Sequence, residues 1–333
     1  MLKREPLGTT KLNTNRICLG TGSFGGSTPE EQCLKQLDYF RSQGGNFIDT
    51  AVGYCDWLIK PERSCSQKLL GRWMRDKHCR AEMIISCKGC HDAVLVPTDN
   101  ALTSQRAEPQ LHRADIIKAI DVSLMNLMTD YLDIFTLHKD NPAVPVAEII
   151  TTLQEQKQQG KILAYGCSNW TVERQREAVS YALSHGCDGF SVDQIGWCLN
   201  VQNVDSPSYK TKVLMDDEAY RFHQQSKIPV MAYAANGRAY FHRLANQLEV
   251  RDQERSEYDN DINRRILAVL MQAAQETGAE VNTIVISYLL LDHGFQTIPI
   301  IGVKSIRELD ICLAALDYQL PTVFEQQLRA LTR

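Results

Sequence analysis

The chain has 333 residues, of which 44% are hydrophobic and 23% charged, and its formal net charge is −4. This composition is typical of a soluble globule, and no basic stripe or tail indicates binding to nucleic acid or to an anionic membrane surface. No apolar segment follows the first charged residues and no apolar run is long enough to span a bilayer, so we expect a cytoplasmic protein.

The first 15 residues come before the first long apolar strand. Within them, residues 7–12 read Leu-Gly-Thr-Thr-Lys-Leu and predict a small hairpin that turns at residues 8–10. We expect this hairpin to cap the closed, N-terminal end of the barrel that the rest of the chain predicts.

Short runs rich in β-branched residues then alternate with longer amphipathic stretches. The expected strands are residues 16–20, 46–49, 82–87, 131–137, 162–167, 189–194, 228–233 and 297–301. The expected helices are residues 30–43, 63–75, 113–128, 146–158, 171–184, 214–226, 262–277 and 305–316. Thr28 and Thr171 precede first-turn acids and are predicted to be N-caps.

Eight strand-then-helix units predict a parallel sheet, because each return to the same direction needs a crossover. Eight is also the number that closes into a (β/α)8 TIM barrel, and we expect one such domain over residues 1–333. The alternative is an open doubly wound sheet with a phosphate-binding turn. Residues 20–25, Gly-Thr-Gly-Ser-Phe-Gly, fit its Gly-x-Gly-x-x-Gly pattern, but no acidic residue follows in the ribose-binding position. We interpret this turn as a tight strand-to-helix loop and keep Gly22 as a candidate cofactor contact.

Three long loops, residues 89–112, 198–213 and 234–260, follow expected strands. All three would open on the C-terminal face of a barrel, where such loops usually act as lids or binding loops.

The 11 cysteines are an odd set without regular spacing, which argues against a disulfide framework. Cys87 and Cys90 form the one suggestive pair, but a zinc site would need two more ligands at finger-like spacing. His91 is adjacent, and the sequence offers no second pair. We interpret the pair as free thiols at the end of a buried strand, with a redox pair as the alternative.

Polar residues stand where three consecutive expected strands end. Asp49 ends the second strand, Lys88 follows the third and His138 follows the fourth, while Tyr54 lies in the loop after the second. On a barrel these positions share one mouth, which is where barrel active sites lie. Each residue alone has an ordinary structural role. Asp49 could be an N-cap, Tyr54 a loop aromatic, Lys88 a lysine that snorkels from a strand end, and His138 a hydrogen-bonded, partly buried histidine. Their joint occurrence favours an active site.

The four side chains suit one reaction. A tyrosine with a pKa of about 10 is a poor proton donor at neutral pH, and an adjacent cation lowers that pKa. Lys88 can supply the cation, Asp49 can hold it, and His138 can orient a carbonyl oxygen, so Tyr54 would act as a general acid. None of the four can attack the carbonyl carbon, which points to a cofactor hydride.

The segment 47–54, Phe-Ile-Asp-Thr-Ala-Val-Gly-Tyr, resembles the Asp-Thr-Ala-x-x-Tyr signature of the aldo-keto reductases. Lys88 and His138 fall where that family keeps its Lys and His, and residues 166–170, Gly-Cys-Ser-Asn-Trp, match its element after the fifth strand. The resemblance covers essentially the whole chain. It implies a (β/α)8 barrel that reduces aldehydes and ketones with a nicotinamide cofactor, with Tyr54 as the proton donor.

The resemblance also implies cofactor contacts. Ser168, Asn169 and Gln194 would hold the nicotinamide carboxamide, and Tyr233 would stack on its ring. The last loop would grip the adenosine phosphates through Gly302, Lys304, Ser305 and Arg307, since a helix beginning near Ser305 offers free N–H groups and the two cations could pair with a 2′-phosphate. The alternative roles are helix caps for Ser168, Asn169 and Gln194, a core tyrosine for Tyr233, and a solvated first helical turn for the residues of the last loop.

The chain departs from the family pattern near the cofactor. Ile311 and Cys312 stand where Glu-Asn is common, Glu308 replaces a basic or amide residue, and residues 234–237 read Ala-Ala-Asn-Gly instead of Ser-Pro-Leu-Gly. These departures weigh against an NADP preference, whereas Lys304 and Arg307 could pair with its 2′-phosphate; we favour NADP(H), with NAD(H) as the second possibility. The expected substrate is a small carbonyl compound, with Trp57, His91, Trp170 and Trp197 as candidate pocket residues.

The sequence thus predicts an NADP(H)-dependent reductase of an aldehyde or ketone. Three alternatives stay open: an NAD-dependent alcohol or sugar dehydrogenase, a cofactor-binding regulatory subunit with little turnover and, more remotely, a sugar-phosphate isomerase or aldolase on the same barrel.

Overall fold

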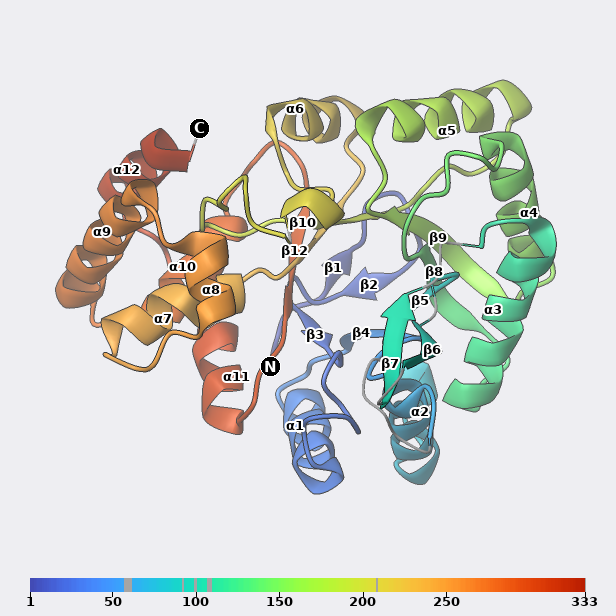
Figure 1. The fold of residues 1–333 in the computed structure, drawn as a ribbon, viewed down its shortest axis with the longest axis horizontal. Coiled ribbons are helices and arrows are strands. Elements are labelled where there is room, and N and C mark those ends of the chain that lie inside the picture. Colours follow the sequence, from blue (N-terminus) through green and yellow to red (C-terminus); the bar gives the residue numbers. More distant parts are fainter. Residues whose placement is uncertain (57–61, 92, 99–100, 107–109, 208, 333) are drawn as a thin grey trace. The chain divides into compact units, whose positions relative to one another are not determined.

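The computed structural model describes residues 1–56, 62–91, 93–98, 101–106, 110–207 and 209–332. Eight parallel strands form a closed barrel in the order β10-β11-β12-β3-β4-β5-β8-β9, which confirms the predicted (β/α)8 class (Figure 1). The chain divides into two compact units, Met1–Gln194 and Ile195–Arg333.

The first unit begins with a hairpin and then alternates strands with helices. Its elements are β1 (Glu5–Pro6), β2 (Asn13–Thr14), β3 (Cys18–Gly20), α1 (Glu30–Ser42), β4 (Phe47–Ala51), α2 (Cys65–Asp76), β5 (Ile84–Gly89), β6 (Ala93–Thr98), β7 (Ala101–Arg106), α3 (Arg113–Leu127), β8 (Leu132–Leu137), α4 (Val146–Gln158), β9 (Ile162–Ser168), α5 (Val172–His185) and the start of β10 (Asp193–Gly196). Every residue of β4 and β8 is buried, as expected for strands covered on both faces.

The N-terminal hairpin is present, with Glu5 paired to Thr14 in antiparallel register. The Leu7 carbonyl accepts the Thr10 N–H at 3.0 Å, which closes the predicted turn. Asn15 and Asn46 exchange reciprocal side-chain-to-backbone hydrogen bonds of 3.1 and 2.7 Å. Because Asn15 and Asn46 precede β3 and β4, these bonds hold the end of the hairpin beside the N-terminal ends of those strands.

The second unit contains two barrel strands and most of the helices that sequence periodicity did not predict. Its elements are α6 (Asp217–Ser226), β11 (Val230–Tyr233), α7 (Tyr240–Ala245), α8 (Asp252–Tyr258), α9 (Asp261–Thr277), α10 (Val281–Leu289), β12 (Thr297–Ile301), α11 (Ile306–Leu313) and α12 (Thr322–Thr332). All nine residues of α10 are buried, so this helix shows no polar face and no amphipathic period.

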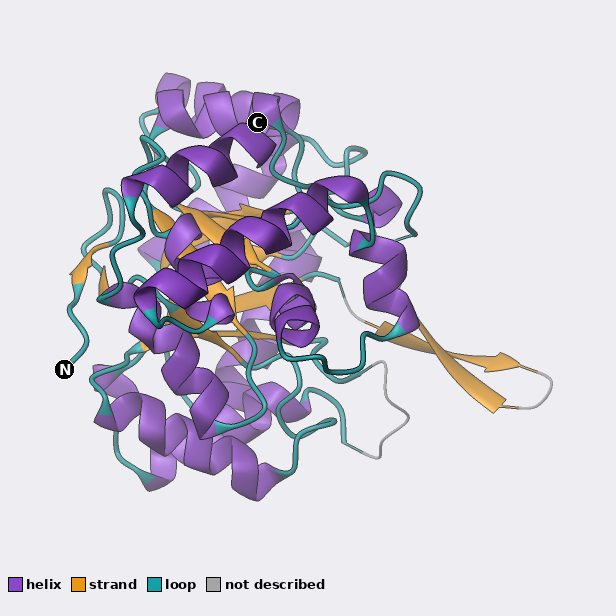
Figure 2. Ribbon diagram, turned by 90° about the vertical axis from the view of Figure 1, so that its left-hand side faces the viewer, coloured by secondary structure: helices purple, strands orange, loops and turns teal. Residues whose placement is uncertain are grey.

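Two expectations about local structure are corrected. Thr28 does not cap α1, because Pro29 is its N-cap and the Thr28 hydroxyl donates to Ser23 Oγ at 2.9 Å. The loop expected at residues 89–112 contains the antiparallel ribbon β6–β7, which extends to the right in Figure 2, apart from the other strands. The Thr171 cap is confirmed, since its hydroxyl accepts the Arg174 N–H.

Among the described residues, no helix combines the length and the apolar character that crossing a bilayer requires.

Candidate active site

Asp49 and Lys88 come from neighbouring barrel strands of the first unit. Asp49 on β4 pairs in register with Ser86 on β5, and Lys88 lies two residues beyond Ser86. Because side chains alternate along a strand, Asp49 and Lys88 project from the same face of the sheet. Both are almost fully buried, with exposed fractions of 0% and 1%. A buried carboxylate and ammonium require each other, since either charge alone would be strongly destabilising.

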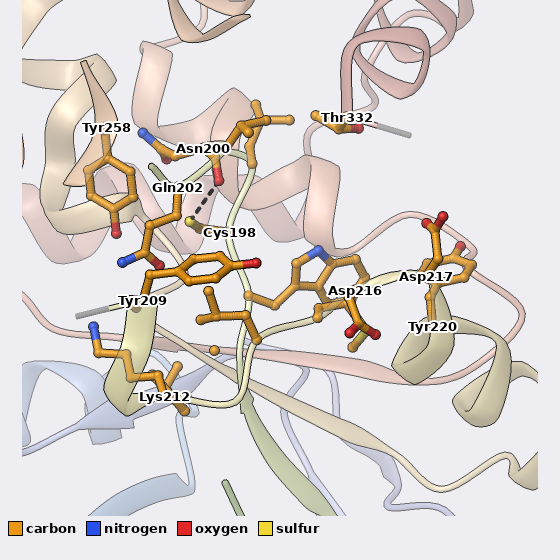
Figure 3. A pocket seen from close by; sticks show the side chains of 18 of the residues that line it. Cys198, Asn200, Gln202, Tyr209, Lys212, Asp216, Asp217, Tyr220, Tyr258 and Thr332 are labelled. Atoms are coloured by element: carbon orange, nitrogen blue, oxygen red, sulfur yellow. Dashed lines mark hydrogen bonds between the residues drawn. The ribbon is translucent and has the colours of Figure 1, made fainter. Parts of the chain in front are cut away.

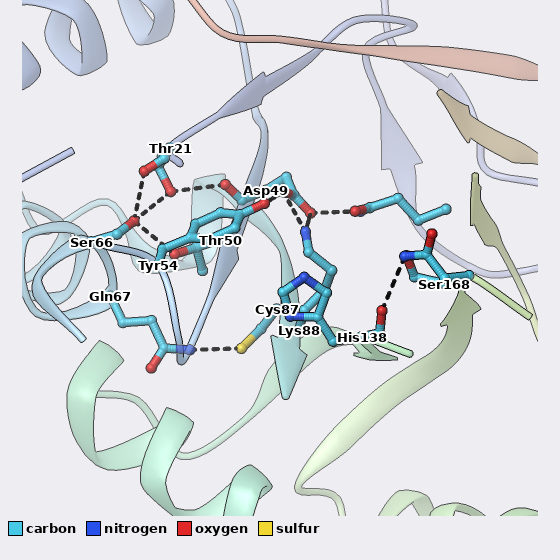
Figure 4. Close-up of polar contacts among 12 residues, drawn as sticks. Thr21, Asp49, Thr50, Tyr54, Ser66, Gln67, Cys87, Lys88, His138 and Ser168 are labelled. Atoms are coloured by element: carbon cyan, nitrogen blue, oxygen red, sulfur yellow. Dashed lines mark hydrogen bonds and ion pairs between the residues drawn. The ribbon is translucent and has the colours of Figure 1, made fainter. Parts of the chain in front are cut away.

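The Asp49 carboxylate is the centre of the cluster (Figure 4). It accepts hydrogen bonds from the Lys88 ammonium at 2.7 Å on Oδ1 and 2.6 Å on Oδ2. The Gln194 amide donates to Oδ1 at 2.7 Å, and the Tyr54 hydroxyl donates to Oδ2 at 2.9 Å. One carboxylate therefore fixes the positions of the cation, the amide and the phenol.

Tyr54 lies within reach of both its neighbours. The Lys88 ammonium is 4.9 Å from the centroid of the Tyr54 ring, close enough to stabilise negative charge on the phenol. The His138 ring meets the Tyr54 ring edge to face, with centroids 6.3 Å apart. A Cβ at Gly22 would lie 3.8 Å from the Tyr54 ring, so Gly22 borders the phenol. The structure thus brings together the four residues that the sequence selected.

His138 follows β8 and is anchored through its backbone. Its N–H donates to the Gly89 carbonyl at 3.1 Å, and its carbonyl accepts the Asn169 side-chain amide at 3.2 Å. His91, a candidate pocket residue, meets the His138 ring edge to face at 5.6 Å between centroids. The backbone of His138 is therefore held at both its N–H and its carbonyl, and the imidazole has an aromatic neighbour on two sides, Tyr54 and His91.

A set of buried hydroxyls supports Asp49 and was missed in the sequence. The Thr21 hydroxyl donates to the Asp49 carbonyl at 2.9 Å, and Ser66 on α2 lies 2.6 Å from the Thr21 hydroxyl and 3.0 Å from that of Thr50 (Figure 4). The sequence signal that could have revealed this network is a small polar residue, Ser66, on the inner face of an amphipathic helix.

Cys87, next to Lys88, is a packed thiol rather than a reactive one. It accepts a hydrogen bond from the Gln67 amide at 3.0 Å, and burial raises its pKa to about 12. Such a thiol carries almost no thiolate at neutral pH, and the thiolate is the nucleophile and metal ligand. All 11 cysteines are free thiols in this structure.

The residues expected to hold the nicotinamide carboxamide gather at the end of β9. Gln194 is in register with Ser168, and the Asn169 amide donates to Ser168 Oγ at 3.1 Å. Asn169 takes the left-handed conformation, with φ of 55°. Donors and acceptors at one strand end fit a planar carboxamide, with one difference from the expectation: the Gln194 amide N–H already donates to Asp49.

In the second unit, Tyr233 ends β11 and is half-buried. Its hydroxyl donates to the Val213 carbonyl at 3.5 Å, and a Cβ at Gly196 would come within 3.1 Å of it. Tyr233 is therefore held at its hydroxyl end while part of its side chain stays accessible, which suits a stacking surface better than a core position.

A pocket of about 290 Å³ in the same unit is rich in basic residues. Gly302 and Lys304, two of the candidate cofactor contacts, line it together with three arginines that the sequence did not single out: Arg238, Arg243 and Arg251. A Cβ at Gly302 would meet no atom within 4 Å, so the backbone there is open to a ligand. The donor set fits a phosphate-bearing group, because arginine and lysine are the side chains that bind phosphate.

The two remaining residues of the last loop differ in position. Ser305 is the N-cap of α11 and its hydroxyl accepts the Glu308 N–H at 3.2 Å, while Glu308 in turn accepts the Lys304 N–H at 2.7 Å. The Arg307 side chain is 85% exposed and lies 3.7 Å from Glu280, outside the lining of the basic pocket. Glu308 lines that pocket and partly offsets its positive charge.

The expected substrate-pocket tryptophans fall in three different places. Trp57 lies outside the described residues. The expectation for Trp170 is wrong, because this side chain is completely buried and packs edge to face on Phe190 at 5.0 Å, as a core residue. Trp197 does line a pocket, of about 680 Å³, in the second unit (Figure 3).

The family model described as Aldo/keto reductase family matches residues 16–333. The chain is 24% identical over 319 residues to the norsolorinic acid reductase stcV of Emericella nidulans, covering 93% of this chain and 76% of that protein. It is 25% identical over 337 residues to an aryl-alcohol dehydrogenase (NADP+) of Phanerodontia chrysosporium, covering 93% and 80%. A solved thermostable aldo-keto reductase in complex with the inhibitor epalrestat shares the fold, with a TM-score of 0.71, 22% identity, and coverage of 99% of this chain and 100% of that chain.

Proposed function

This chain belongs to the aldo/keto reductase family, and we propose that it reduces an aldehyde or ketone to the alcohol with NADPH, with Tyr54 as the proton donor. The observation that carries the proposal is the buried cluster in which the Tyr54 hydroxyl and the Lys88 ammonium meet the Asp49 carboxylate. A bound reduced nicotinamide supplies the hydride that these side chains cannot.

Tyr54 holds the proton that the carbonyl oxygen needs. As that proton leaves, negative charge grows on the phenol oxygen, and the Lys88 ammonium, 4.9 Å from the ring centroid, stabilises it. Asp49 keeps the ammonium in place, and the Gln194 amide fixes the carboxylate from its other side. His138 donates a hydrogen bond that orients the substrate oxygen toward the Tyr54 hydroxyl.

The chain also offers residues for each part of the cofactor. Ser168, Asn169 and Gln194 would hold the carboxamide, and Tyr233 would stack on the ring. The basic pocket around Gly302 and Lys304 would hold the phosphates. Arg238, Arg243 and Arg251 line the same pocket while they pair with Glu257 and Glu254, and their remaining guanidinium N–H groups would favour a 2′-phosphate, hence NADP(H) over NAD(H). The relative named as an NADP+-linked aryl-alcohol dehydrogenase supports the same preference, and its name favours an aromatic carbonyl substrate.

The experiment that tests this function is consumption of NADPH and, separately, of NADH with a panel of aromatic and aliphatic aldehydes, with the alcohol product identified. We expect turnover of aldehydes with NADPH and clearly weaker binding of NADH. Tighter NADH binding, with faster oxidation of alcohols or sugars than reduction of aldehydes, supports the NAD-linked dehydrogenase instead.

A cofactor-binding regulatory subunit makes a different prediction. The wild-type protein would bind NADPH, detected by quenching of tryptophan fluorescence, yet reduce every aldehyde no faster than a Tyr54→Phe variant. The buried Asp49–Lys88 pair and its hydroxyl support argue for turnover, because a protein that only binds the cofactor has no need of a pre-positioned proton donor.

A further inference from the structure

The imidazole of His138 has to be aimed, because under the proposed function its N–H must point at the substrate oxygen. The backbone of His138 is held, since its N–H donates to the Gly89 carbonyl at 3.1 Å and its carbonyl accepts the Asn169 amide at 3.2 Å. These two bonds leave the torsion between Cβ and the ring soft, because histidine has only broad preferences at that torsion. Contacts made by the ring itself must therefore set the direction of its N–H.

Two rings of the first unit make such contacts. The Tyr54 ring, drawn beside His138 in Figure 4, meets it edge to face, with centroids 6.3 Å apart and planes at 84°. The His91 ring meets it edge to face as well, and is closer, at 5.6 Å and 78°. Edge-to-face pairs at this separation hold a ring in orientation, because the positive edge of one ring is attracted to the negative face of the other. The contact with His91 can be removed without removing the proposed proton donor.

The chain turns sharply to bring His91 to this position. Cys90, directly before it, lies in the left-handed region, with φ of 67°. Residues with a Cβ rarely adopt this conformation, and where the surrounding structure holds them in it they cluster at functional sites. The turn is tied down, since the Cys90 carbonyl accepts the Gln110 N–H at 3.2 Å. Strand β5 also ends close to β8, because a Cβ at Gly89 would lie only 2.9 Å from the Phe135 ring.

We propose that His91 is a positioning residue for carbonyl reduction: its ring holds the His138 imidazole in the orientation in which the N–H meets the substrate oxygen. This inference rests on the proposed function, because His91 acts through His138. Both side chains are half-buried, so the contact lies at the border of the site and not in the packed core. The ring contact carries the role, so an aromatic ring of similar size should replace the imidazole of His91.

The first test is the kcat of aldehyde reduction with saturating NADPH in wild type, His91→Ala and His91→Phe. For His91→Ala we expect kcat to fall about three- to tenfold, the effect of losing one edge-to-face pair, while the Kd of NADPH stays within twofold. His91→Phe keeps a ring against His138 and should stay within twofold of wild type. His185→Ala is the matched control, because this exposed histidine stacks on Tyr181 at 4.0 Å on α5 and should leave kcat unchanged.

A double-mutant cycle separates positioning from every other role of His91, because a residue that acts through another has no effect once that other residue is absent. In the His138→Ala background, His91→Ala should therefore change kcat by less than twofold. The same loss in both backgrounds would overturn the inference, since His91 would then act on the substrate or the fold by another route. A His91→Phe variant as slow as His91→Ala would also overturn it, because the polarity of the imidazole and not the ring contact would then matter.

A spectroscopic measurement distinguishes failure of this inference from failure of the proposed function. In protein labelled with ¹⁵N-histidine, the ring nitrogens of His138 are assigned by their disappearance in His138→Ala. His91→Ala should broaden these signals or average them between tautomers, whereas His91→Phe and His185→Ala should leave them as sharp as in wild type. If wild type reduces no aldehyde, the proposed function fails, and the His138 signals still test the positioning. Signals that stay sharp in His91→Ala would overturn it.

Discussion

Replacing Lys88 by methionine should slow aldehyde reduction without removing the proton donor. In the folded protein the ammonium lies 4.9 Å from the centroid of the Tyr54 ring. With an effective dielectric constant of about 20, a full negative charge at that distance is stabilised by about 3 kcal/mol. If half to all of that charge has developed in the transition state, kcat should fall roughly 20- to 300-fold, since each 1.36 kcal/mol is tenfold in rate.

The same substitution should also destabilise the protein, because it leaves the Asp49 carboxylate buried without a cation. Removing one member of a buried ion pair typically costs about 3–5 kcal/mol. The double variant Asp49→Asn/Lys88→Met makes the pair neutral and should recover much of that stability in urea unfolding, but its kcat should stay low. This separation distinguishes a chemical role of Lys88 from a merely structural one.

The assay is NADPH oxidation under saturating cofactor and aldehyde, with urea unfolding on the same samples. Lys77→Met is the matched control, since Lys77 forms an exposed ion pair with Asp38 at 2.9 Å and should change stability by less than about 1 kcal/mol and kcat not at all. A folded Lys88→Met that keeps kcat within threefold of wild type would refute the electrostatic argument.

Three further predictions concern packing, cofactor and thiol chemistry. Gly71→Ala should destabilise the protein by about 1–3 kcal/mol in urea unfolding, because the added Cβ would collide with the Asn126 backbone oxygen. Gly189→Ala should be nearly neutral, because the atom nearest to its added Cβ is 3.6 Å away. Equal effects of the two substitutions would contradict the packing argument. Lys304→Met should raise the Kd of NADPH about tenfold and leave that of NADH unchanged, and the exposed Arg307→Met should do less; an equal loss for both cofactors would argue against 2′-phosphate recognition. Burial raises the pKa of Cys198 to about 11, so about a thousandth of this thiol is thiolate at pH 8. Its alkylation by iodoacetamide, measured by peptide mass spectrometry, should therefore become about tenfold faster with each pH unit until the pH reaches that pKa. Labelling at the rate of an ordinary exposed thiol would contradict this.

The sequence predicted the barrel and grouped four candidate site residues because both inferences depend on local signals. Alternating runs of β-branched and amphipathic residues mark strands and helices, and the ends of consecutive parallel strands must meet at one edge. Asp49, Lys88 and His138 could therefore be grouped before any distance was known. What periodicity could not give is the hydrogen-bonding pattern, in which the Tyr54 hydroxyl donates to Asp49.

The elements that were missed lack such signals for physical reasons. Helix α10 is buried on all sides, so its sequence has no polar face. Among the described residues, β6 and β7 form a separate two-stranded sheet, and β6 includes Pro97, which a long central strand would exclude. Among the arginines of the basic pocket, Arg238 lies in the short turn Gly237–Ala239, Arg243 in the short helix α7, and Arg251 is the N-cap of α8; single charged residues in such short elements follow no period. Trp170 was assigned to a pocket wall because a tryptophan after a strand end looks the same in sequence whether it is buried or exposed.

The most direct test of the account is the kcat of Tyr54→Phe measured beside wild type with NADPH and an aldehyde that the wild-type enzyme reduces. Phenylalanine keeps the ring and removes only the hydroxyl that donates to Asp49. Loss of a general acid typically costs about 10²- to 10⁴-fold, so we predict a fall of at least about a hundredfold while the Kd of NADPH stays within threefold. A Tyr54→Phe protein that reduces the aldehyde at a rate close to wild type would show that the proton comes from another group.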